Sequence, residues 1–180
     1  MVEKLDFITP TLTQVLGLFL SDSMGEYHER EVMRRTRVSK GSANKMLRLL
    51  AKENFLKRQR KGRIVLYRLN TKEPTAKQFK ILVNVFGLRS LIGELKDHAR
   101  RIILFGSSAD GTDVKDSDID VFVLTSEKDV VRRKISEFGR KSDRKITPII
   151  VDATELVRLK NRDKPLYENI GRGIVLWETE

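Results

Sequence analysis

Cysteine is absent from the 180 residues, which excludes disulfide bonds and thiolate metal sites and makes a reducing cytoplasm the expected location. Apolar runs are short: the stretch from Val15 to Leu20 falls far below the length of a membrane span. The first ten residues carry Glu3 and Asp6 and have no apolar segment, so we expect no signal peptide and no membrane partner. Aromatic residues make up 7% of the chain and hydrophobic residues 39%, so the cores must be mainly aliphatic.

Positive charge is concentrated in the first part of the chain. The formal net charge is +11 at pH 7, and residues 30–68 hold 14 Lys and Arg side chains against two acidic ones, Glu31 and Glu53. Residues 75–180 hold 20 basic and 17 acidic side chains. A solvated surface normally mixes both signs, so a local excess of one sign indicates a polyanionic partner. Nucleic acid is the polyanion that we expect.

The pattern of residues 9–70 predicts three short helices and a hairpin. Thr9-Pro10 is a helix-start signal, and the following apolar residues recur at helical spacing up to Leu20. A second helix is expected over residues 26–35, with Val32 and Met33 facing inward.

Ser39 can cap the third helix. Its apolar stripe consists of Ala43, Met46, Leu47 and Leu50. Two strand-like runs then flank Lys61-Gly62, which suits a tight turn. Three short helices followed by a basic hairpin is the layout of a winged helix-turn-helix domain.

Winged helix-turn-helix domains place the third helix in the major groove of DNA and the wing against the backbone or minor groove. The side chains expected to face DNA are Lys40, Asn44, Lys45 and Arg48 from the helix and Arg58, Arg60, Lys61 and Arg63 from the wing. Asn44 and Arg48 are the expected base readers, and the lysines the expected phosphate contacts. Double-stranded DNA is the predicted partner, with a homodimer on a symmetric site as a candidate assembly. Use of the same fold for protein contacts is the alternative.

The second part of the chain mixes strands and helices. Residues 71–75 suggest a linker, and residues 76–100 are expected to be helical with a break at Gly87. Further on, strands are expected at 101–105, 119–124, 146–151 and 173–177, and helices at 130–140 and 154–162. The predicted fold class is α+β. A winged helix-turn-helix domain (1–74) and a connecting helical segment (75–100) precede a small α/β domain with a mixed sheet (101–180).

Residues 105–124 read FGSSADGTDVKDSDIDVFVL and hold five aspartates, at positions 110, 113, 116, 118 and 120. Like charges this close repel, so the cluster is costly unless something positive binds there. A P-loop does not fit, because the lysine that should follow its second glycine is Thr112. An EF-hand does not fit either, because the glycine required at its sixth position is Val121.

Gly106-Ser107, ten further residues and Asp118-Ile119-Asp120 at the start of an apolar strand resemble the G-S-x10-D-x-D signature of the nucleotidyltransferase superfamily. The similarity is greatest to its minimal members and covers about residues 101–177. The resemblance implies that Gly106 and Ser107 hold the phosphates of a nucleoside triphosphate such as ATP. It also implies that Asp118 and Asp120 are the catalytic carboxylates and hold two Mg²⁺ ions. Alternate side chains of a strand project from one face, which suits this role.

The sequence departs from that signature in two places. Active members add a third acidic metal ligand from a neighbouring strand, which aligns here with Thr147 or Pro148. Asp152 is the nearest substitute, but Asp152 and Glu155 form a capping pattern for the next helix. In addition, relatives often have an arginine after Gly-Ser, where this chain has Ser108 and Asp110.

Two functions follow as hypotheses. In the first, a DNA-binding protein transfers a nucleoside monophosphate, AMP from ATP with Mg²⁺, to an acceptor. Some minimal members modify a partner toxin, so the resemblance makes a toxin protein a candidate acceptor and an antitoxin a candidate role. In the second, the protein is a transcriptional regulator whose nucleotidyltransferase-like domain is inactive and senses nucleotide or mediates assembly.

Overall fold

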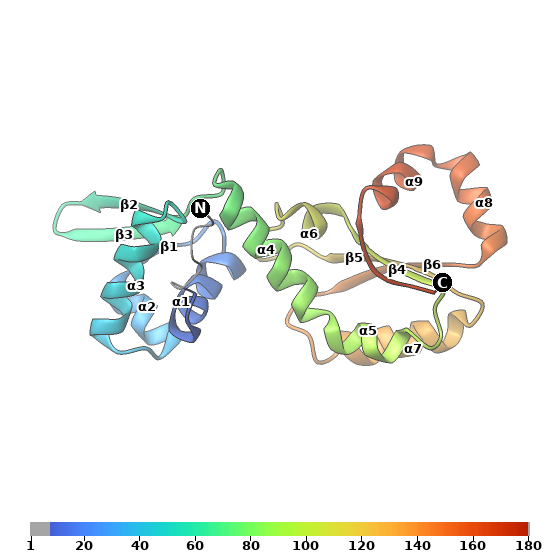
Figure 1. Ribbon diagram of the computed structural model, residues 1–180, viewed down its shortest axis with the longest axis horizontal. Helices are drawn as coiled ribbons and strands as arrows, with labels where there is room; N and C mark the ends of the chain where they lie inside the picture. Colours follow the sequence, from blue (N-terminus) through green and yellow to red (C-terminus); the bar gives the residue numbers. More distant parts are fainter. Residues whose placement is uncertain (1–7, 180) are drawn as a thin grey trace, which may run out of the picture. The chain divides into compact units, whose positions relative to one another are not determined.

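A computed structural model describes residues 8–179 of the chain (Figure 1). Residues 1–7, where we expected no signal peptide, lie outside the described range. The chain divides into two compact units, with the boundary between Phe79 and Lys80. Within the described residues, no helix combines the length and the apolar character that crossing a membrane requires.

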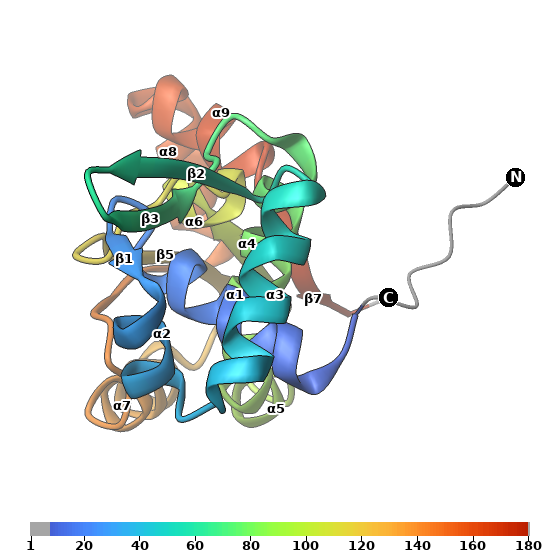
Figure 2. The same cartoon turned by 90° about the vertical axis from the view of Figure 1, so that its left-hand side faces the viewer.

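The first unit is a winged helix-turn-helix. Its elements are α1 (Pro10–Ser21), β1 (Glu26–His28), α2 (Glu29–Thr36), α3 (Lys40–Lys52), β2 (Leu56–Lys61) and β3 (Ile64–Leu69). The three strands form an antiparallel sheet in the order β1-β3-β2. In both views α2, α3 and the hairpin of β2 and β3 lie side by side (Figures 1 and 2).

Local signals explain where most of these elements begin. The hydroxyl of Thr9 accepts a hydrogen bond from the Leu12 amide at the start of α1, and Ser39 caps α3 in the same way. Gly62 has a φ of 63° at the tip of the hairpin, a conformation that favours glycine. These parts of the prediction are confirmed.

Two local predictions were wrong. Residues 26–28 were expected to be helical but form β1, because they pair with Leu66–Arg68 of β3. The helix begins only at Glu29, where His28 caps it in a capping box with Glu31. Val32 is buried as expected, but Met33 is partly exposed and lines a surface groove.

The second unit is built on a mixed four-stranded sheet in the order β6-β5-β4-β7. Its strands are β4 (Arg101–Phe105), β5 (Ile119–Leu124), β6 (Ile146–Val151) and β7 (Ile174–Glu178). Its helices are α5 (Arg89–Leu95), α6 (Gly106–Asp110), α7 (Lys128–Gly139), α8 (Ala153–Arg162) and α9 (Lys164–Gly171). β5 pairs antiparallel with β4 and parallel with β6. The structure confirms the α+β fold class with a mixed sheet.

Helices cover both faces of this sheet (Figure 1). Leu104, Val121 and Val123 face one side and pack with residues of α5 and α7. Ile103 and Phe122 face the other side and pack against α8 and α9. This alternation along each strand holds β4 and β5 at the centre of the unit, so the residues at their ends have a rigid support.

The residues expected to connect the two domains form two helices. α4 (Pro74–Gly87) contains the boundary between the units and ends at Gly87, where we predicted a break. Ala76 belongs to the core of the first unit, and Leu91 and Leu95 of α5 are buried in the core of the second. α5 is therefore part of the second unit.

Candidate functional site

The signature glycine lies where β4 ends and α6 begins. Gly106 has a φ of 66°, and a Cβ at this position would stand 2.6 Å from Oδ2 of Asp120. The register of the sheet explains this approach, because Phe105 pairs with Asp120. The backbone conformation favours glycine, and any larger residue would also force the Asp120 carboxylate to move.

Of the two signature aspartates, Asp118 immediately precedes β5 and Asp120 is the second residue of that strand. Asp120 pairs across to β4 on one side and to Thr147 of β6 on the other. Burial raises the pKa of the Asp120 carboxyl, and the negative charge of Asp118 raises it further. The two carboxylates are therefore close enough to interact.

Asp118 already has partners from the chain. Its Oδ2 accepts hydrogen bonds from Nζ of Lys145 and from Oγ1 of Thr147, both at 2.8 Å. The Lys145 ammonium, followed by the Thr147 hydroxyl, lowers the pKa of the Asp118 carboxyl below its ordinary value. A proton is therefore held less readily by Asp118 than by Asp120.

Arg144 donates hydrogen bonds to both ends of the aspartate-rich loop between β4 and β5. Its Nε donates to the carbonyl of Ser117 at 3.1 Å, and its Nη2 donates to Oγ of Ser108 at 3.0 Å and to the carbonyl of Asp118 at 3.4 Å. Its Nη1 donates to Oδ1 of Asn84 at 3.1 Å. One guanidinium thus connects the Gly-Ser turn, the start of β5 and α4.

Asp113 lies in the same loop and is buried, with a side chain that is 4% exposed. Its Oδ2 lies 3.0 Å from Nη1 of Arg144 and 3.7 Å from Nζ of Lys80, whose side chain is also 4% exposed. Nδ2 of Asn84 donates to its Oδ1 at 3.0 Å. Two of the crowded aspartates, Asp113 and Asp118, are therefore neutralised by the protein's own cations.

The donor set does not fit a two-ion metal centre. Mg²⁺ prefers oxygen ligands from carboxylates, and the position opposite Asp120 on β6 carries the neutral hydroxyl of Thr147. Asp152 lies five residues further along the chain, about 16 Å away at the usual strand rise. There it caps α8 in a capping box with Glu155 and pairs with Lys128 at 2.9 Å. Among residues 8–179, no group of three or more His, Cys, Asp or Glu side chains is placed to hold a metal ion.

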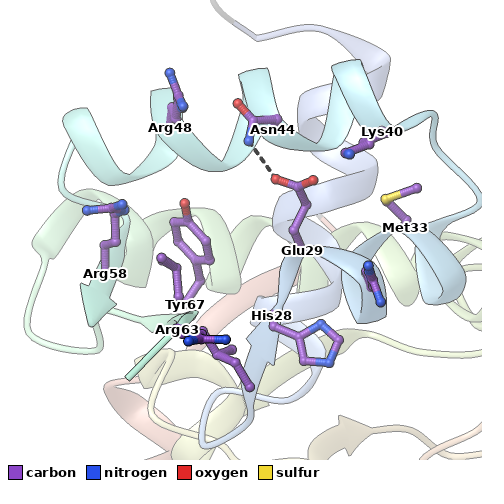
Figure 3. Close-up of a pocket in the computed structure, with 12 residues that line it drawn as sticks. His28, Glu29, Met33, Lys40, Asn44, Arg48, Arg58, Arg63 and Tyr67 are labelled. Carbon is purple, nitrogen blue, oxygen red and sulfur yellow. Dashed lines mark hydrogen bonds between the residues drawn. The ribbon is translucent and has the colours of Figure 1, made fainter. Parts of the chain in front are cut away.

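The first unit carries a groove of about 610 Å³ between α2, α3 and the hairpin (Figure 3). Five basic side chains line it: Arg30, Lys40, Arg48, Arg58 and Arg63. A second groove of about 550 Å³ along α3 shares Lys40, Asn44 and Arg48 with it and adds Lys45. The structure thus brings together the residues predicted on α3 with two of the four predicted on the wing.

The other two wing residues are engaged elsewhere. Arg60 donates from Nε to the carbonyl of Gly62 at 3.1 Å, and Nζ of Lys61 lies 2.9 Å from Oε2 of Glu26. Neither lines the described grooves.

Glu29 contributes a negative charge to the groove. Its Oε2 accepts a hydrogen bond from Nδ2 of Asn44 at 2.5 Å, so the amide expected to read bases is held by a carboxylate (Figure 3). Sequence reasoning missed this contact, as it missed Arg30 and Tyr67 in the same groove.

Comparison with known proteins gives one family match and weak similarity to solved structures. The family described as "Polymerase beta, Nucleotidyltransferase" matches residues 90–180. A search of curated proteins gave no match.

Two solved structures resemble the chain weakly. A mutant of Lactococcus lactis ZitR is 20% identical over 54% of this chain and 68% of its own, with a TM-score of 0.37. TrmBL2, an archaeal chromatin protein with a novel mode of DNA binding, is 12% identical over 92% of this chain and 74% of its own, with a TM-score of 0.34.

The family match extends over more than half of the 180 residues and contains the Gly106 turn, both signature aspartates and the sheet that carries them. The chain belongs to the polymerase beta nucleotidyltransferase family.

Proposed function

We propose that this protein is a regulator that binds double-stranded DNA through the groove of its winged helix-turn-helix unit. The observation that carries the proposal is the convergence of five basic side chains from α2, α3 and the hairpin on one groove. Phosphates are recognised by clusters of this kind, and α3 is the element that such domains place in the major groove.

Charge supports DNA over a protein partner. Residues 30–68 have 14 basic side chains against two acidic ones, and the side chains of Lys40, Lys45, Arg48, Arg58 and Arg63 are exposed. Apolar protein interfaces instead deplete charged residues at their centre. The exposed guanidinium of Arg48 suits base reading, and the lysines of the two grooves suit phosphate contact.

Binding to duplex DNA tests the proposal. Replacing Lys40 and Arg63 with alanine should weaken binding and reduce the slope of log K against log salt by about two, because each lost phosphate contact removes about one unit. The matched control is Lys52→Ala with Lys72→Ala, which removes the same charge from positions outside both described grooves. An equal loss of DNA affinity in the two double variants would show that net charge alone, and not the groove, determines binding. The mass of the complex on a palindromic duplex tests the homodimer.

Transfer of a nucleoside monophosphate is the second candidate function. The close approach of Gly106 to Asp120, with Asp118 beside it, favours this function. Incubation with labelled ATP, Mg²⁺ and candidate acceptors, a partner toxin protein among them, tests it. Label transfer that disappears in both Asp118→Asn and Asp120→Asn would establish the enzyme and, with a toxin as acceptor, the antitoxin role. DNA binding without transfer to any acceptor would leave the regulator.

A further inference from the structure

One carboxylate oxygen of the signature aspartate Asp118 is already hydrogen-bonded by the chain. Its Oδ2 accepts from both Lys145 and Thr147 at 2.8 Å. These two residues come from the start of β6 and the loop before it, the segment from which the family supplies its third acidic ligand. An ammonium and a hydroxyl therefore stand where the third carboxylate and a cation are expected.

The backbone fixes this arrangement. The amide of Ile119 donates to the carbonyl of Lys145 at 2.8 Å, and Thr147 pairs with Asp120 in the parallel register of β5 and β6. Asp118 itself is held through its carbonyl by Arg144 at 3.4 Å. The pairing of β5 with β6 thus places Lys145 and Thr147 next to Asp118, and their side chains complete the contacts.

Charge determines what this site can accept. Three carboxylates would offset three of the four positive charges of two divalent ions. Here Thr147 contributes none, and Lys145 already neutralises Asp118, which leaves Asp120 as the uncompensated carboxylate of the signature. Without a polyphosphate, two cations beside one uncompensated carboxylate would repel each other and the Lys145 ammonium.

We propose that Lys145 and Thr147 replace the metal centre of this family by an internal ion pair and hydrogen bond, so that the second unit does not assemble a two-ion site. Thr147 makes the larger contribution. The side chain of Lys145 is 74% exposed, and exposed ion pairs are weak, so a divalent ion could displace the ammonium but could not create the missing carboxylate.

A gain of Mn²⁺ binding tests this proposal without relying on activity. Full-length protein is titrated with Mn²⁺ alone and the free ion is followed by electron paramagnetic resonance. Thr147→Asp should bind Mn²⁺ at least about tenfold more tightly than the wild type, since even residues outside a coordination shell contribute about 10- to 100-fold. Lys145→Ala should give a smaller gain, and the double variant the largest.

The matched control uses the same positions without the new carboxylate. The variant with Lys145→Ala and Thr147→Val should gain no more Mn²⁺ affinity than Lys145→Ala alone. Adding Asp118→Asn to the variant with Lys145→Ala and Thr147→Asp should abolish its gain in affinity. Because Lys145 is exposed, its single variant keeps the test decisive even if Thr147→Asp fails to fold. Tight wild-type binding of two Mn²⁺ ions, or equal affinity in wild type and Thr147→Asp, would overturn the proposal. DNA binding is measured separately, so the two proposals fail independently.

Discussion

Asp113 provides a sharp test of what holds the candidate site together. Asp113→Asn keeps the shape of the side chain but removes the charge that faces Lys80 and Arg144. The Lys80 side chain is 4% exposed and its Nζ also donates to the Asp113 carbonyl, so in the variant its ammonium would remain buried with this neutral acceptor but without the facing carboxylate. Breaking a buried pair on one side costs about 3–5 kcal/mol. Domains are stable by only about 5–15 kcal/mol, so the second unit should lose a large part of its stability.

Calorimetry on the full chain can resolve this effect, because a loss of 3–5 kcal/mol lowers the Tm of a unit of about 100 residues by roughly 12–40 °C. The transition of the second unit should move and that of the first should not. Glu168→Gln is the control, since the Lys164–Glu168 pair is 78% and 49% exposed and should contribute about 1 kcal/mol or less. A loss below about 1 kcal/mol for Asp113→Asn would refute the reasoning. A double variant with Asp113→Asn and Lys80→Met should lose less stability than the sum of the losses in the two single variants.

Three further outcomes follow from particular contacts. The Lys128 ammonium lowers the pKa of Asp152, so this carboxylate stabilises the fold above its unfolded pKa of about 3.9 and that contribution disappears as pH falls through the lower folded pKa. Lys128→Met should raise the pKa of Asp152 toward its ordinary value in an NMR titration. Burial raises the pKa of Tyr27 to about 12, so its contribution is complete below the unfolded pKa of about 10 and declines as pH rises toward 12. Tyr27→Phe should abolish that alkaline decline in denaturant melts. Glu29→Gln keeps an acceptor for Asn44 but removes a negative charge from the groove, so fluorescence anisotropy should show tighter duplex binding by up to about 1 kcal/mol.

Elements with a strong local pattern could be predicted from the sequence. The three apolar runs at 101–105, 119–124 and 146–151 became strands with those bounds, because their apolar residues pack into the cores on the two faces of the sheet. The Ser39 cap and the apolar stripe of α3 were also predicted correctly, because a cap and a helical period depend on residues within one segment.

Features decided by distant partners could not be predicted in this way. Residues 26–28 are a strand only because β3, about forty residues later, offers an edge for them. Arg144 carries no local signal of its importance, since its contacts reach Asn84, Ser108 and Asp113 from across the unit. Met33 fits the inward face of a helix by spacing, yet the groove beside α2 leaves it partly exposed.

The aspartate cluster shows how far a charge argument from sequence can reach. Crowded acids do require positive charge, but the sequence does not say where that charge comes from. For Asp113 it comes from Lys80 and Arg144, which are 33 and 31 residues away in the chain, and for Asp118 it comes from Lys145. Asp110 and Asp116 are exposed, where water and salt screen them. The cluster can therefore persist without a bound ion or polyphosphate. Asp120 is the signature carboxylate that would still be stabilised by a bound cation.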